Sequence, residues 1–236
     1  MNHDSASLSA FYASPVGQVT RRVIQRRLRE VWPDMEGTRL LGYGFAIPYL
    51  RSLAADTEFA AALVPEQLGA VAWPSDTCRS VVAQEDALPF PDAMFDRVLV
   101  IHGLESAESL RPLLRQLWRV LAPSGKLLLV APNRTSLWAQ VERSPFAHGR
   151  PFNRAQLGSL LHDTLYVAER WESALLMPPL RSRRFLGRGV SWEKLGRRIW
   201  PALAGIHIVE ATKSMYALTP PLQAKQERRL FASARG

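Results

Sequence analysis

The chain has 236 residues, of which 47% are hydrophobic and 22% are charged. These proportions are ordinary for a globular protein and exclude a chain that is disordered throughout. A single cysteine, Cys78, excludes an internal disulfide and any metal site built from several cysteines. The formal net charge is +9, and residues 181–236 carry the whole excess, with twelve Lys or Arg against three acids.

No membrane or export signal is evident in the sequence. The longest apolar runs, such as LLLVAP at 127–132, are far too short to cross a bilayer. The first residues, MNHDSASLSAFYASP, lack the basic stretch and the long apolar core of a secretory signal. We therefore expect a cytoplasmic protein without a transmembrane segment.

Two readings are open for the basic end of the chain. Residues 180–201 mix basic side chains with Phe185, Trp192 and Trp200. Such a surface attracts a polyanion or an acidic protein partner. Arginine stems that cover apolar surface explain the same pattern without any partner. Nucleic acid is not the partner that we expect.

The first third of the chain predicts a helix, two strands and further short helices. Residues 18–32 place apolar side chains at helical spacing with arginines between them, and Pro33 ends that helix. RLLGYG at 39–44 is typical of a buried strand and a turn. The remaining expectations are a helix through IPYLRSLAA at 47–55, a strand FAAALVP at 59–65 for which helix competes, and a short helix at 66–73.

The remainder of the chain alternates strands with helices. Residues 95–105 predict a strand that runs into a loop, and 106–121 predict a strong helix with Ser106 as its cap. Further strands are expected at 80–84, 122–133, 166–177 and 205–218, and a further helix at 153–165. This alternation predicts an α/β fold with a doubly wound, mostly parallel sheet. We expect a Rossmann-like core over 1–180, with 181–236 completing the sheet and ending in a tail.

Several motifs resemble a known family in their order. Leu41-Gly42-Tyr43-Gly44 resembles a cofactor loop, and the stretch at 87–96, ALPFPDAMFD, resembles the segment before a fourth strand. Residues 11–17, 65–68 and 118–126 also match. Over roughly residues 10–165 the chain resembles the class I S-adenosylmethionine (SAM) dependent methyltransferases of type 11, which act on small molecules. The resemblance implies a Rossmann-like fold and SAM as cofactor.

The cofactor motif departs from that family at its acids. The resemblance places Gly42 and Gly44 at the cofactor and Gln84 near its adenine. Tyr43 either lines the cofactor or is an ordinary turn residue, and Glu85 and Asp86 are neighbouring acids that are further candidates for binding it. The family carries one acid where this chain has Leu40, another where it has Ala62 or Leu63, and a third where it has Gln84. Ala46 replaces a third glycine. Losing two charged partners weakens binding by about two to four orders of magnitude, unless Glu66, Glu85 or Asp86 compensates.

Candidate acceptor residues follow the fourth and fifth strands. His102 is the best-placed general base, although histidine is also a frequent pocket residue without acid–base duty in the family. Asn133 lies where a doubly wound sheet binds ligands. His148 and Arg150 lie in a loop that either contacts substrate or is ordinary, with Asn153 capping the next helix. No cluster of side chains suggests a metal site.

Two functions are therefore open. One is a SAM-dependent methyltransferase that acts on an unidentified small molecule through an atypical cofactor pocket. The other is a non-catalytic module of the same fold that binds a protein or a polyanion. An NAD-linked oxidoreductase is disfavoured, because the GxGxxG pattern fails at Ile47 and the ribose acid is absent.

Overall fold

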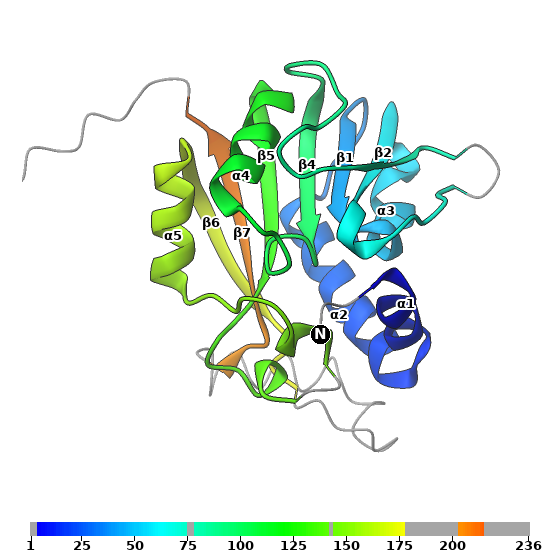
Figure 1. Cartoon of the computed structure of the whole chain (residues 1–236), viewed down its shortest axis with the longest axis vertical. Coiled ribbons are helices and arrows are strands. Elements are labelled where there is room, and N and C mark those ends of the chain that lie inside the picture. Colours follow the sequence, from blue (N-terminus) through cyan, green and yellow to red (C-terminus); the bar gives the residue numbers. More distant parts are fainter. Residues whose placement is uncertain (1–3, 75–77, 142–143, 178–202, 215–236) are drawn as a thin grey trace, which may run out of the picture.

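A single seven-stranded sheet organises the chain in the computed structural model, which describes residues 4–74, 78–141, 144–177 and 203–214. The strand order is β3-β2-β1-β4-β5-β7-β6 (Figure 1). The strands are β1 Arg39–Gly44, β2 Phe59–Pro65, β3 Ser80–Ala83, β4 Phe95–Ile101, β5 Leu121–Pro132, β6 Tyr166–Ala174 and β7 Ile206–Lys213.

The pairing of the strands confirms the predicted fold. Strands β1 to β5 pair in parallel, whereas β7 is antiparallel to both β5 and β6. The order reverses between β1 and β4, since the chain passes from β1 to β2 on one side and returns to β4 on the other. This is the topological switch point at which open α/β sheets bind ligands, at the carboxyl ends of the strands.

Helices cover both faces of the sheet. One apolar layer packs α2 and α3 on the face that carries Leu40, and the other packs α4 and α5 on the face that carries Leu41 and Tyr43. The helices are α1 Ser5–Ala13, α2 Pro15–Val31, α3 Ile47–Leu53, α4 Leu110–Val120 and α5 Arg154–Asp163, with short 3-10 turns η1 Ala54–Asp56, η2 Glu66–Leu68, η3 Leu137–Ala139 and η4 Pro145–Ala147.

Three sequence expectations about helices need correction. Helix α1 was not expected; it buries only Leu8 and Tyr12, too few apolar residues to give a helical pattern. The segment at 66–73 forms only the η2 turn. Helix α4 begins at Leu110 with Ser109 as its N-cap. Ser106 is therefore not the cap, and its hydroxyl instead donates to the carbonyls of His102 and Gly103.

The two glycines of the cofactor-like motif are required by the packing of the protein itself. A Cβ at Gly42 would lie 2.8 Å from both terminal carbons of Leu50, on α3. Gly44 has φ +83°, and a Cβ there would lie 2.3 Å from the carbonyl oxygen of Ile101. Only glycine combines that positive φ with so close a backbone approach. The motif is thus explained without a cofactor.

Strand β7 belongs to the segment 181–236 that was expected to complete the sheet. It lies between β5 and β6. The aromatic and basic stretch at 180–201 and the tail after 214 lie outside the described residues, so the division at residue 180 and the partner of the basic segment stay predictions. In the part of the chain that the structure describes, no helix has the length and apolar character needed to span a bilayer.

Candidate functional site

The switch point lies between the ends of β1 and β4. The backbone N–H of Phe45 donates to the carbonyl of Ile101 at 2.8 Å, which fixes the two strand ends side by side. His102 follows β4 directly and has φ +53°, a conformation that non-glycine residues rarely adopt. Its side chain is only 4% exposed. Such strained residues cluster at functional sites, so the backbone of His102 indicates a candidate site at the end of β4.

A chain of four buried polar side chains runs through this point. The Tyr49 hydroxyl donates to the Tyr12 oxygen at 2.8 Å. The Tyr12 hydroxyl lies 2.7 Å from His102 Nε2, and His102 Nδ1 lies 3.1 Å from Glu105 Oε1. Helix α1 supplies Tyr12, α3 supplies Tyr49, and the loop after β4 supplies the other two. Three distant segments are thus joined at the switch point.

The hydrogen bonds, taken in the direction from Tyr49 to Tyr12, imply one tautomer of the histidine. Because Tyr12 accepts from Tyr49, its own single proton is left to donate to His102 Nε2. The proton on a neutral ring then resides on Nδ1 and is donated to Glu105. Burial raises the pKa of Tyr12 well above its ordinary 10.0, and nearby Tyr49 and the charge of Glu105 raise it further. Tyr12 therefore stays protonated and remains a donor at neutral pH.

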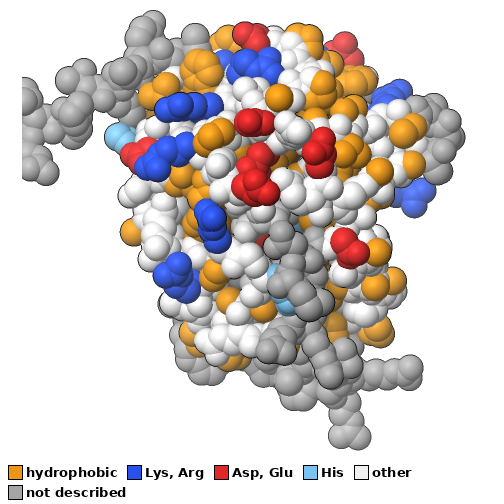
Figure 2. All heavy atoms as spheres, viewed as in Figure 1, with side chains coloured by type: hydrophobic (Ala, Val, Ile, Leu, Met, Phe, Trp, Pro, Cys, Tyr) orange, Lys and Arg blue, Asp and Glu red, His pale blue; other side chains and the backbone are white. Residues whose placement is uncertain are grey.

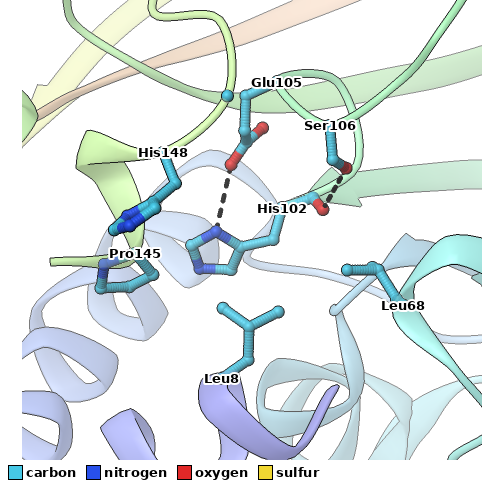
Figure 3. A pocket seen from close by; sticks show the side chains of 8 residues that line it. Leu8, Leu68, His102, Glu105, Ser106, Pro145 and His148 are labelled. Atoms are coloured by element: carbon cyan, nitrogen blue, oxygen red, sulfur yellow. Dashed lines mark hydrogen bonds and ion pairs between the residues drawn. The ribbon is translucent and has the colours of Figure 1, made fainter. Parts of the chain in front are cut away.

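A small cavity of about 20 Å³ lies beside this chain (Figure 3). His102 and Glu105 point into it from the loop after β4, and Leu8 of α1 closes it from the opposite side. Its remaining lining residues are Leu68, Ser106, Pro145, His148 and Gly149. A water molecule needs about 10–15 Å³ of such space, so the cavity admits one small group.

The carboxylate of Glu105 has one oxygen, Oε2, without a hydrogen-bond partner among the residues that the structure describes. The side chain is 4% exposed, and Oε2 itself is buried. The loop at 148–150 holds the backbone of this residue: the N–H of Arg150 donates to the Glu105 carbonyl at 2.9 Å. A Cβ on Gly149 would lie 2.3 Å from that same carbonyl oxygen. A buried carboxylate oxygen left unpaired is a costly feature that a ligand could satisfy.

A second, larger cavity of about 400 Å³ lies at the ends of β2 and β3. Its lining is acidic. Figure 2, which has the same view as Figure 1, shows several acidic side chains close together on this face of the molecule. Both cavities share two flanking segments, the η2 turn and the loop after β4. The larger one is lined by Glu66, Gln67, Gln84, Glu85, Asp86, Glu108, Ser109 and Pro112.

The six residues predicted to bind the cofactor fall into two groups. Gln84, Glu85 and Asp86 line the acidic cavity. Glu85 is already engaged there, since its carboxylate accepts from the backbone N–H of Ser109 at 2.7 Å and from that of Glu108 at 3.2 Å. Gly42, Tyr43 and Gly44 line neither cavity. Tyr43 is fully buried, and its hydroxyl has no partner among the described residues.

The two halves of an adenosyl cofactor fit this site differently. The acidic cavity has the size of a small-molecule pocket, and Glu66, Gln84 and Asp86 are exposed acceptors for ribose and adenine groups. At the end of β1 the amino-acid half would meet no acid, because Leu40 is fully buried in an apolar layer. Tyr12, stacked on Phe45 with ring centroids 6.0 Å apart, already spans the switch point there. The residues fit the adenosine half and do not fit the amino-acid half.

The four residues predicted to act on or bind the methyl acceptor do not lie together: two line the small cavity and two do not. His102 and His148 line the small cavity, where His148 Nδ1 lies 3.1 Å from the Ser144 carbonyl. Asn133 is buried and donates to the carbonyl of Ala204 at 2.9 Å, which ties the end of β5 to the segment before β7. The Arg150 side chain is exposed and lines neither cavity. Asn153 caps α5 in a capping box, as expected.

Tyr12, Tyr49 and Glu105 were not predicted as site residues. Tyr12 lies in the family-matched stretch at 11–17, to which the sequence assigned no site role. Glu105 was a visible acid three residues after His102, a spacing that permits contact in a tight loop. Nothing in the sequence indicates that Tyr49 meets Tyr12. Among the described residues, no group of three or more possible ligands suggests a metal site.

Comparison with known proteins agrees with the fold and the motif order. Residues 41–129 match the methyltransferase domain family. The ubiquinone/menaquinone biosynthesis C-methyltransferase UbiE of Pectobacterium atrosepticum is 40% identical over 55 residues, which are 23% of this chain and only 22% of UbiE. The uncharacterized protein YafS of Escherichia coli K12 is 27% identical over 223 residues, covering 92% of this chain and 86% of YafS.

Solved structures extend the likeness beyond the matched domain. A SAM-dependent methyltransferase from Archaeoglobus fulgidus superimposes with a TM-score of 0.58, at 18% identity, over 82% of this chain and 94% of that one. Likeness at this level of identity concerns the fold alone. Residues 41–129 match the methyltransferase domain family, and the chain as described has the class I methyltransferase fold. Its reaction is a separate question, because one fold hosts many functions.

Proposed function

We propose that this protein is an enzyme that transfers a methyl group to a small-molecule acceptor bound beside the carboxyl end of β4. The observation that carries the proposal is the hydrogen-bonded pair of His102 and Glu105, which lines a cavity next to the switch point. Ionisable side chains that meet in a cavity are candidates for a functional site. The position of this pair beside the site expected for a ligand supports a catalytic use.

The residues of this chain would divide the work between the two cavities. Glu66, Gln84 and Asp86 would hold the adenosine half of SAM in the acidic cavity. When bound, the cofactor would supply an activated methyl group for in-line substitution, a reaction that depends largely on positioning. The acceptor would enter the small cavity, where the His102–Glu105 pair receives its proton. Leu8 and Leu68 would keep bulk water away from that pair.

A non-catalytic role is the second candidate, and a specific observation favours it. The amino-acid half of SAM finds no acid at the end of β1, because Leu40 lies in the apolar layer and Tyr12 spans the switch point. In that case the chain would be a methyltransferase-fold module that binds a protein or a polyanion through residues 181–236. It would bind neither SAM nor its product.

Calorimetric titration with SAM and with S-adenosylhomocysteine separates the two candidates. If the protein is an enzyme, we expect it to bind both compounds with micromolar affinity. The substitution Glu66→Gln should then weaken this binding about tenfold, because it removes one charged acceptor. Glu36→Gln is the matched control, because this exposed acid precedes β1 at the opposite end of the strands. Absence of heat with the cofactor at about 1 mM, a concentration at which a site of 1 mM Kd is half filled, would leave the non-catalytic role.

A further inference from the structure

We propose that Glu105, and not His102, is the group that binds the ligand in the small cavity, and that the ligand carries a primary or secondary ammonium group. The inference rests on the proposed function only in treating this cavity as the acceptor end of the site. The binding of an ammonium group stands on the geometry of the cavity itself. It assigns a ligand chemistry and a residue role that the fold alone does not supply.

Both ring nitrogens of His102 already have hydrogen-bond partners, so His102 is not the group that is free to bind a ligand. Tyr12 donates to Nε2 at 2.7 Å, and Nδ1–H donates to Glu105 Oε1 at 3.1 Å. Both ring nitrogens are therefore engaged, and a ligand proton could reach Nε2 only by displacing Tyr12. Glu105 lines the cavity, and its buried Oε2 has no hydrogen-bond partner among the described residues. It is the acceptor that the structure leaves open.

The charge of Glu105 calls for a cation. Among the described residues its only ion-pair partner is His102, whose ring carries no permanent charge. A carboxylate withdrawn from water without a countercharge is strongly destabilised, and a bound cation relieves that cost. The polar groups that share the cavity are Ser106 and His148, and neither is a permanent cation. A positively charged ligand with an N–H donor satisfies both the charge and the open oxygen.

The size of the cavity selects among cations. About 20 Å³ of water-accessible space favours one small headgroup, such as –NH₃⁺. A quaternary group has no N–H to donate to Oε2. The apolar walls made by Leu8, Leu68 and Pro145 suit a hydrocarbon stem attached to the amine (Figure 3). The ligand class is therefore a small or narrow aliphatic amine.

The same geometry assigns two distinct roles in proton transfer. The ammonium N–H bond breaks as its proton moves to Glu105 Oε2, which leaves a neutral amine whose lone pair is free to attack. His102 keeps its proton on Nδ1 and holds Oε1, so it is a positioning residue. Tyr12 fixes the tautomer of that ring from the other side. Glu105 is then the catalytic residue of the pair.

Titration of the whole protein with methylammonium tests the inference without knowledge of the natural ligand. The readout is the ring ¹⁵N–¹H correlation of His102, which reports both its tautomer and the bond to Glu105. We expect the Nδ1–H tautomer at neutral pH and a saturable shift of this signal with methylammonium. Tetramethylammonium at the same concentrations should leave the signal unchanged. Equal shifts with both cations would overturn the inference, and so would an Nε2–H tautomer.

Two matched variants sharpen the test. Glu105→Gln should weaken methylammonium binding at least about tenfold, because the charge is lost. Glu36→Gln, at an exposed acid that precedes β1 and lines neither cavity, should bind it as the wild type does. If Glu105→Gln fails to fold, the wild-type comparison of the two cations still decides. Loss of S-adenosylhomocysteine binding with methylammonium binding intact would sink the proposed reaction alone, whereas the reverse would sink only this inference.

Discussion

The Tyr12 hydroxyl lies 2.7 Å from His102 Nε2, although the two residues are 90 positions apart in the chain. This one contact ties α1 to the end of β4 (Figure 1). Tyr12 therefore has two roles: its ring fills the switch point, and its hydroxyl contacts the His102 ring that lines the small cavity. The stability of α1 and the chemistry of His102 are therefore coupled.

Tyr12→Phe should reveal that coupling. The substitution leaves two buried groups without partners, the Tyr49 hydroxyl and His102 Nε2, and should lower the free energy of unfolding by about 2 kcal/mol. Tyr49→Phe removes one bond only, because Tyr12 can still donate to His102, and should cost about 1 kcal/mol. Urea denaturation of both variants provides the measurement. Equal losses would contradict the directional chain.

Gly44→Ala should destabilise the fold rather than probe a cofactor. The alanine Cβ would lie 2.3 Å from the Ile101 carbonyl oxygen at φ +83°, so we expect a loss of about 3 kcal/mol from combined clash and backbone strain. Gly37→Ala is the control, since it has φ +65° with nothing within 4 Å and should cost about 1 kcal/mol. Thermal unfolding of both variants measures the difference. Similar losses would show that the close approach at Gly44 carries no weight.

Much of the fold could be predicted because its signals are local. The run FAAALVP and the VLVI part of FDRVLVI are continuous and apolar, as a strand buried on both faces requires. Both segments are strands with the expected ends or close to them. Helix α1 could not be predicted, because it buries only two residues and is stabilised by contacts with distant segments. Ser106 and Ser109 are equivalent as cap candidates in sequence, and the structure alone distinguishes them.

The candidate site was predictable only where residues lie close in the chain. Gln84, Glu85 and Asp86 are neighbours and line one cavity together, and His102 marks the end of an obvious strand. The contact of Tyr12 with His102 spans 90 positions and depends on how α1 folds back over the sheet. A single sequence carries no signal for such a pair. The open oxygen of Glu105 is likewise a property of packing.

Glu85→Gln tests whether this acid serves the protein or a ligand. Its two oxygens accept from the backbone N–H groups of Glu108 and Ser109, which precede α4. An amide offers one acceptor and no charge, so the free energy of unfolding should fall by about 1–2 kcal/mol. Asp86→Asn, at an exposed neighbour, should change it by less than about 0.5 kcal/mol. Guanidinium denaturation checks both, and a silent Glu85→Gln would free this acid for a ligand role.

Tyr43→Phe should leave the protein as stable as before. The Tyr43 hydroxyl is buried without a partner among the described residues, so its removal should change the free energy of unfolding by no more than about 0.5 kcal/mol, in either direction. Because the ring lies in the layer packed against α4, we also expect S-adenosylhomocysteine affinity to be unchanged. A selective loss of affinity at unchanged stability would place this hydroxyl at the ligand instead.

Asp96→Asn should lower stability at neutral pH and have little effect in acid. Arg39 holds Asp96 through its side chain, with Nε to Oδ2 at 3.0 Å and Nη2 to Oδ1 at 3.1 Å. This pairing lowers the pKa of Asp96 from its ordinary 3.8, although partial burial opposes the shift. A lowered pKa means stability that is present above the unfolded value and is lost as pH falls through the folded one.

The expected size is modest, because the Asp96 side chain is 31% exposed. Wild type and Asp96→Asn should differ by about 1 kcal/mol at pH 7, and the difference should shrink once the pH falls below about 4. Asp92→Asn is the control: its side chain is 77% exposed beside Arg119, and an exposed pair contributes less than about 0.5 kcal/mol. Urea denaturation of the wild type and both variants, at several pH values from about 3 to about 7, measures these differences in the free energy of unfolding. A difference that stays constant across that range would mean that Asp96 acts by shape and hydrogen bonding alone, without its charge.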